Sequence, residues 1–297
     1  MDYIRTLARE FDVGGRLELA IENRSGVVTV RGEDTTDVRL DVVAHLWAED
    51  EDEAADQLEL ISRGIKHDGQ RLTIRAPALL RPKPFFFFGR SPRIDYTLAV
   101  PRNCRASITS WSGRAEVENI SGPLELIGRS GRVSAREIAG DVTVDKSSGH
   151  SQLEGIGGTV TVESKSGGVR VHRCRKTCTV KSRSGSVQVE DVQGDVDVDT
   201  RSGTAAVSDA GGAVKITARS GSIRYEGGVH GPIDIEVWSG SVRVAVEPGS
   251  VFFIDAESTH GSVRSEMPMR SESTEPPPGA PTMRLRTRAG SILIAPR

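Results

Sequence analysis

A regularly spaced row of residues, most of them basic, is the feature of this sequence whose types best suit binding chemistry. Each member precedes a Ser-Gly pair; the members recur with a period of 18, with a last step of 19, and are Trp111, Arg129, Ser147, Lys165, Arg183, Arg201, Arg219 and Trp238. Like charges held at one spacing repel each other unless something compensates them. The row therefore predicts a surface for an anionic polymer or an acidic protein, with tryptophans able to stack on a sugar or a base. The alternative is a solvated edge that prevents lateral aggregation.

Three aspartates offer a second kind of chemistry. Asp195, Asp197 and Asp199 alternate with valine, so they face outward from one strand. Paired carboxylates are what polysaccharide-cleaving enzymes use, which makes a polysaccharide-active β-helix enzyme an alternative function. The repeat, however, places Lys215 beside Asp197 and Lys181 beside Asp199. Alternating charges along a column favour surface ion pairs over catalysis.

The histidines and cysteines do not converge on a site. The six histidines are scattered, and His172 shares an outward column only with Glu154 and Glu190, which predicts an ion pair. Cys174 and Cys178 could bind a metal or form a disulfide, but both occupy apolar columns and are interpreted as core residues. Cys104 stands alone and is expected to be inert. We find no Ser-His-Asp order, phosphate loop or dinucleotide fingerprint, so the sequence predicts no catalytic residue, no metal site, no cofactor and no enzymatic activity.

The elements that must position these residues come from an internal repeat with the same period. Most Ser-Gly pairs are followed half a period later by a second glycine, and short Val-rich runs alternate after each bend, as in Val187-Gln-Val189. Period-two alternation predicts strands with one buried face, and glycine suits bends with positive φ. Like residues recur from unit to unit, as in the column Leu126, Val144, Val162, Val180, Val198, Ile216 and Ile235. This favours a parallel, right-handed β-solenoid over the alternative, a flat antiparallel meander.

The repeated Ser-Gly-x-Val-x-Val, with Gly-Asp-Val-x-Val halfway along the unit, resembles the bacterial toast-rack or "putative adhesin" family. The resemblance covers residues 14–297 and implies a right-handed β-helix without an assigned biochemical activity. Family members often carry a membrane anchor or a signal, and some are linked to envelope-stress systems. The resemblance thus implies a non-enzymatic, adhesin-like binding or assembly scaffold linked to the bacterial envelope or to stress sensing.

Composition shifts along the chain predict four segments. Residues 1–10 are expected to form a tail, and residues 11–105 an N-terminal β-rich cap with one short helix at 49–62. The regular all-β solenoid, with its 18-residue coils, is expected over 106–246. Residues 247–297 are expected to form C-terminal coils and a cap, with a Pro-rich loop at 275–281 and the last coil at 283–294.

A loop with four consecutive phenylalanines interrupts the N-terminal segment. Phe85, Phe86, Phe87 and Phe88 are flanked by Arg81, Lys83, Arg90 and Arg93, a composition that favours an anionic membrane surface. A peripheral membrane protein is therefore the third functional hypothesis. The alternatives are that the phenylalanines pack on the cap or bury in a contact between two copies of the chain.

Overall charge and hydropathy restrict the remaining classes. The formal net charge is −2, so the whole surface does not attract polyanions, and no specific nucleic acid is predicted. No apolar run is long enough to form a transmembrane helix, and the first residues lack the apolar region of a signal peptide. Together with three cysteines this predicts an unanchored, cytoplasmic protein.

Overall fold

The computed structural model describes residues 1–76, 92–267 and 279–297, and within them the chain is all-β with one helix. The chain forms two compact units, Met1–Ser148 (unit 1) and Gly149–Arg297 (unit 2), which are described separately. The predicted β-solenoid fits this architecture. Phe85–Phe88 and residues 275–278 of the Pro-rich loop lie outside the described residues, and the predicted boundaries at 106 and 246 remain predictions.

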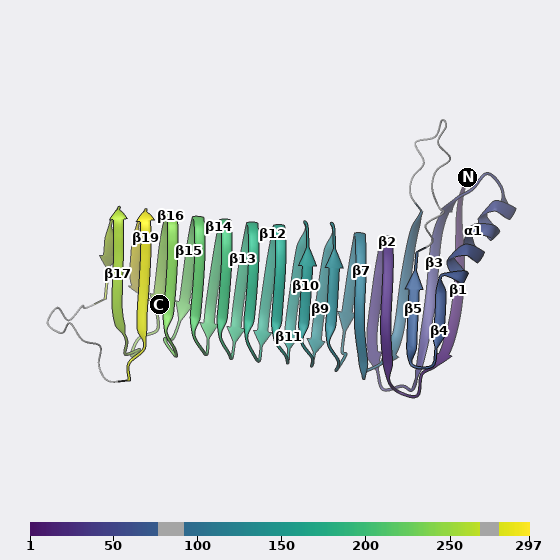
Figure 1. Cartoon of the computed structure of the whole chain (residues 1–297), viewed down its shortest axis with the longest axis horizontal. Coiled ribbons are helices and arrows are strands. Elements are labelled where there is room, and N and C mark those ends of the chain that lie inside the picture. The colour runs from purple at the N-terminus through teal and green to yellow at the C-terminus, as the bar shows by residue number, and fades with distance from the viewer. Residues whose placement is uncertain (77–91, 268–278) are drawn as a thin grey trace. The chain divides into compact units, whose positions relative to one another are not determined.

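Twenty strands and the helix occupy the described residues (Figure 1). Unit 1 holds β1 (Asp2–Asp12), β2 (Leu17–Glu33), β3 (Asp37–Trp47), α1 (Glu51–Arg63), β4 (Ile65–Asp68), β5 (Arg71–Arg75), β6 (Arg93–Pro101), β7 (Cys104–Glu118), β8 (Leu124–Gly128), β9 (Arg132–Ile138) and β10 (Val142–Lys146). Unit 2 holds β11 (His150–Ile156), β12 (Val160–Cys174), β13 (Cys178–Val192), β14 (Val196–Ala210), β15 (Val214–Gly227), β16 (Ile233–Val246), β17 (Phe253–His260), β18 (Val263–Ser265), β19 (Thr282–Ala289) and β20 (Ile292–Pro296).

The long strands β12 to β16 of unit 2 pair side by side in parallel (Figure 1). Val180 pairs with Val198, and Val198 pairs with Ile216, and all three side chains are fully buried. Parallel pairing of successive strands contradicts the antiparallel meander for this part of the chain. Within unit 2 the apolar columns read from the sequence are therefore rows of the core, because every second residue of each strand points inward.

The Ser-Gly bends depend on glycine for two reasons. Gly185 has φ of 122°, and a Cβ atom there would lie 1.9 Å from the carbonyl oxygen of Gly167 on the neighbouring strand. The second set of glycines behaves differently from the prediction, because Gly194 does not have positive φ. A Cβ on Gly194 would lie 2.9 Å from the backbone of Lys176, so close backbone approach explains this glycine. Positive φ at that bend falls instead on residues such as Asp191, at 55°.

The C-terminal strands of unit 2 are not stacked in chain order. β19 pairs with β16, as in Ile235 with Leu285, and its other edge pairs with β17, as in Ala256 with Leu285. In the same way β20 lies between β16 and β18. The coil at 283–294 was predicted to be the last one; it instead lies inside the stack, because the chain skips one position after Val246 and returns to fill it.

Unit 1 shows a related reordering at its N-terminal end. β2 pairs with β7 along one edge and with β5 and β6 along the other, all in parallel. β3 pairs antiparallel with β6, and β1 pairs antiparallel with β3. The predicted tail at 1–10 is therefore wrong, since these residues form most of strand β1. Arg5 and Arg9 interrupt the apolar alternation of this strand and are held by α1, Arg5 by Glu51 at 2.8 Å and Arg9 by the Ser62 hydroxyl.

Helix α1 begins two residues later than predicted because Asp50 is its N-cap. The Asp50 carboxylate accepts a hydrogen bond from the Glu53 amide at 2.8 Å, which satisfies one free N–H of the first turn. Ala54 and Ile61 are its buried residues, and the helix ends before Gly64. Across the described ranges, no helix has the length and apolar character needed to cross a bilayer.

Candidate functional site

Unit 2 brings the predicted basic residues into one straight line. Lys165, Arg183, Arg201, Arg219 and Trp238 lie at the same position of β12 to β16, each just before the serine of a bend. The flanking serines pair strand by strand, Ser166 with Ser184, Ser184 with Ser202, Ser202 with Ser220 and Ser220 with Ser239. All five side chains are exposed. Neighbours are therefore one strand spacing apart, about 4.8 Å.

Arg288 extends this line and was missed by sequence reasoning. It occupies the equivalent position on β19, because Ser239 pairs with Ala289. Its guanidinium carbon lies 4.2 Å from the centroid of the Trp238 ring, a close cation–π contact. The Ala289-Gly290 pair was the available signal. We call Lys165, Arg183, Arg201, Arg219, Trp238 and Arg288 the basic row.

Unit 1 repeats the same arrangement around its own tryptophan. Arg24 on β2 and Arg129 lie in the coils on the two sides of Trp111, and each guanidinium carbon is 5.7 Å from the ring centroid. Arg24 was also missed, although Arg24-Ser25-Gly26 carries the bend signature. Ser25 pairs with Ser112, which places Arg24 beside Trp111. In each unit, then, arginine from a neighbouring coil lies against the tryptophan.

This packing changes what the tryptophans can do. Trp111 and Trp238 are about half exposed, but arginines lie against both rings. Stacking on a sugar or a base would have to displace a guanidinium, at a cost of about 0.5–1 kcal/mol for an exposed cation–π pair. The rings therefore act first as spacers that hold guanidinium groups in place.

Among the described residues of unit 2, no carboxylate forms an ion pair with the basic row. Within the described residues, the ion pairs of this unit join other side chains: His172–Glu190, Arg173–Glu154, Arg224–Glu226, Arg284 and Arg286 with Asp255, Arg286 with Glu257, and Arg297 with Asp209 and Glu247. Glu163 and Asp199 lie two residues before members of the row. The strand register places Lys181 between them, so their own column supplies a countercharge.

The backbone of the row is held by hydrogen bonds at the bends. The Ser184 hydroxyl donates to the Lys165 carbonyl at 3.2 Å, and the Ser202 hydroxyl donates to the Arg183 carbonyl at 3.3 Å. Beyond each bend glycine a second line of exposed hydroxyls begins, made of Ser186, Thr204, Ser222 and Ser241. The site is thus a line of cations beside a line of hydroxyls.

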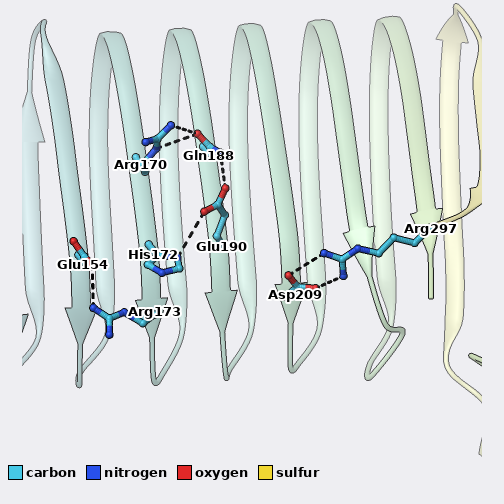
Figure 2. A network of polar contacts seen from close by, with 8 residues as sticks. All are labelled: Glu154, Arg170, His172, Arg173, Gln188, Glu190, Asp209 and Arg297. Carbon is cyan, nitrogen blue, oxygen red and sulfur yellow. Dashed lines mark hydrogen bonds and ion pairs between the residues drawn. The ribbon is translucent and has the colours of Figure 1, made fainter. Parts of the chain in front are cut away.

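A polar network lies in unit 2 beyond the line of hydroxyls, since Gln188 follows Ser186 by two residues on β13 (Figure 2). The Arg170 guanidinium donates twice to the Gln188 carbonyl oxygen, at 2.8 and 3.0 Å, and the Gln188 amide donates to Glu190. His172 Nδ1 lies 3.6 Å from the Glu190 carboxylate, so the two predicted partners are close together, while Glu154 instead binds Arg173 at 3.0 Å. Apart from the Gln188–Glu190 bond, which lies within β13, these contacts cross between neighbouring strands and stabilise the stack.

One of the three aspartates that could have been catalytic, Asp195, holds the backbone of the next coil. The Asp195 carboxylate accepts a hydrogen bond from the Ala213 amide at 2.8 Å, which ties two neighbouring coils together. Asp197 lies opposite Lys215, and Asp199 lies opposite Lys181, as the repeat indicated. This arrangement suits cross-strand charge pairing.

The three cysteines are buried and free, as the apolar columns indicated for Cys174 and Cys178. Burial raises the pKa of the Cys104 thiol to about 12, which makes its thiolate scarce at neutral pH. In the described part of the chain, no group of three His, Cys, Asp or Glu residues is arranged to hold a metal ion.

Comparison with known proteins defines the family. A putative cell adhesion protein from Clostridium sporogenes aligns with 12% identity over 99% of this chain and 100% of that chain, with a TM-score of 0.30. A putative adhesin from Bacteroides fragilis aligns with 12% identity over 99% of this chain and 97% of that chain, with a TM-score of 0.39. Both likenesses are too distant to bear on function, and no curated protein sequence matches this chain significantly. The model of the Toastrack DUF4097 family matches residues 17–277, so the chain belongs to this family.

Proposed function

We propose that this protein is a non-enzymatic, adhesin-like scaffold that binds an anionic partner through the basic row of unit 2. The observation that carries the proposal is the line of four exposed cations, Lys165, Arg183, Arg201 and Arg219, on neighbouring parallel strands. The ion pairs of this unit within the described residues leave all four unmatched.

Repulsion between neighbouring cations of the basic row favours the binding of anions. Two unit charges about 4.8 Å apart repel by about 1 kcal/mol even in bulk water. The Debye length is about 8 Å at physiological ionic strength, so salt only partly screens neighbours in the row. An anionic partner would relieve this repulsion at several positions at once.

The fold suits a scaffold because its buried side chains maintain the stack and leave the outward positions free. Right-handed winding and 18-residue coils are part of this proposal. The parallel pairing of Val169 with Val187 and of Val187 with Ala205 supports the coil length, and the right-handed preference of parallel crossovers supports the winding. A link to the bacterial envelope or to stress sensing belongs to the proposal as well. Cytoplasmic location stays a prediction from the sequence.

A charge-reversal experiment tests the proposal. The double variant R183E/R201E reverses two neighbouring members of the row. The control R224E/R243E makes the same change of net charge at two arginines that also pair on neighbouring strands but lie in another outward column. Binding of fluorescent polygalacturonate, oligothymidylate and polyglutamate would be measured by anisotropy, and binding to phosphatidylglycerol vesicles by co-sedimentation.

We expect the wild type to bind at least one of these polyanions in a salt-sensitive way. R183E/R201E should weaken that binding at least tenfold, and R224E/R243E should leave it within about threefold of the wild type. The proposal is refuted if no polyanion binds or if both variants lose affinity equally.

A further inference from the structure

We infer that the anionic partner is a linear acidic polysaccharide, with about one carboxylate on each sugar unit; this inference rests on the proposed function. The basic row offers one cation per strand in a fixed register from Lys165 to Arg219, and Arg288 continues it beyond Trp238. Five strand steps of about 4.8 Å give a straight line of roughly 24 Å. A regular line of this kind matches a polymer whose charges repeat along an extended chain.

The row is poorly suited to nucleic acid. Single strands are held by aromatic rings on which bases stack, but the Trp238 ring already has Arg288 against it at 4.2 Å. A DNA duplex spaces its phosphates by about 3.4 Å along each strand and winds them around an axis. A straight line of cations would therefore meet only a short stretch of duplex backbone.

The carboxylates beside the basic row disfavour binding of a polymer with closely spaced negative charges. Glu163, Asp199 and Glu236 are exposed and lie two residues before members of the row, on the same side of their strands. Lys181 lies between Glu163 and Asp199, so this column carries charges of both signs. Such a column suits a polymer whose charges are separated by neutral groups better than it suits polyphosphate. The same carboxylates can accept hydrogen bonds from sugar hydroxyls.

The line of hydroxyls next to the row fits a sugar as well. Ser186, Thr204 and Ser222 are exposed directly after the bend glycines, and the Ser241 hydroxyl donates to that of Ser222 at 3.2 Å. Hydroxyl groups both donate and accept hydrogen bonds, as sugar hydroxyls do. Arginines of the row can bind carboxylates with two parallel hydrogen bonds. The basic row thus binds the carboxylates of the polysaccharide, and the line of hydroxyls binds the hydroxyl groups of its sugar rings.

The test compares polygalacturonate with oligothymidylate and polyglutamate at equal charge concentration and equal salt. Neutral dextran is added as a further comparison at the same concentration of sugar units as polygalacturonate. We expect polygalacturonate to bind at least tenfold more tightly than the other two polyanions, and dextran not to bind. T204V/S222A should weaken polygalacturonate binding about threefold or more and leave the weaker polyglutamate binding unchanged. Equal or tighter binding of oligothymidylate or polyglutamate would overturn the polysaccharide inference while leaving the proposed function intact.

Trp238 provides a second readout, because it positions Arg288 and does not need to touch the ligand. W238A should weaken polygalacturonate binding severalfold, whereas W238F should restore it, since phenylalanine keeps a ring under the guanidinium. Thermal unfolding of each variant separates loss of binding from loss of fold. An acidic polysaccharide requires a location outside the cytoplasm, in contrast to the cytoplasmic location that the sequence predicts. Protein found only in the cytoplasmic fraction of cells would therefore overturn this inference and not the proposed function.

Discussion

The inserted position of β19 predicts that a single core substitution releases the end of unit 2. Leu285 is fully buried and pairs with Ile235 of β16 and Ala256 of β17. Replacing a buried leucine with alanine costs about 2–5 kcal/mol. In L285A this cost should fall on the opening of β19, and β17 should open with it because β19 is its pairing partner among the described residues.

Hydrogen exchange measured by mass spectrometry checks this prediction. A loss of about 2–5 kcal/mol in local opening free energy corresponds to roughly 30-fold to several-thousand-fold faster exchange. We expect this acceleration in peptides covering residues 253–260 and 282–289, with residues 196–210 unchanged. The matched control V198A, in the middle of the stack, should not accelerate residues 253–260 selectively.

Two outcomes would refute the reasoning. Unchanged exchange at 253–260 in L285A would mean that β17 is held by something other than β19. Equal acceleration at 196–210 would mean that unit 2 opens as a single cooperative body, so that the inserted coil has no separate stability.

Three further predictions concern stability. Burial lowers the pKa of Lys146 to about 8, so the unfolded chain binds the Lys146 proton more tightly than the folded chain does. The unfolding free energy of the wild type, relative to that of K146M, should therefore rise by up to about 3 kcal/mol between pH 8 and 10.5. Urea denaturation measures this, and the same pH dependence of unfolding free energy in both proteins would contradict it. G185A should destabilise the protein by about 3 kcal/mol or more, because the new Cβ atom would meet the Gly167 carbonyl. The control G69A has a positive φ of 55°, but no atom lies within 4 Å of its Cβ position, so it should cost no more than about 2 kcal/mol in the same denaturation assay. D191G should raise the melting temperature slightly, because a φ of 55° costs a non-glycine residue about 1 kcal/mol. Glycine also raises the conformational entropy of the unfolded chain, which offsets part of this stabilisation. A lower melting temperature would contradict the prediction.

Much of the stack could be predicted because its information is local and repeated. Like residues at a fixed period can share a column only if successive strands pair in parallel, and Val180, Val198 and Ile216 do so in the core. The exposed line from Lys165 to Trp238 followed from the same register. The start of α1 could have been predicted to the residue from Asp50, whose side chain caps the first turn.

The sequence by itself thus determined the strand period, the buried columns and four cations in line, because each depends on neighbours at a constant separation along the chain. Only the tertiary structure decided which segments lie at the ends of each stack. Arg24 reaches Trp111 because β2 pairs with β7, and Arg288 reaches Trp238 because β19 fills the position that the chain skipped after β16. β1 likewise becomes a strand only through β3 and α1. Such pairings join segments far apart in sequence, and they form because an open strand edge and an apolar face must be covered wherever the covering segment comes from.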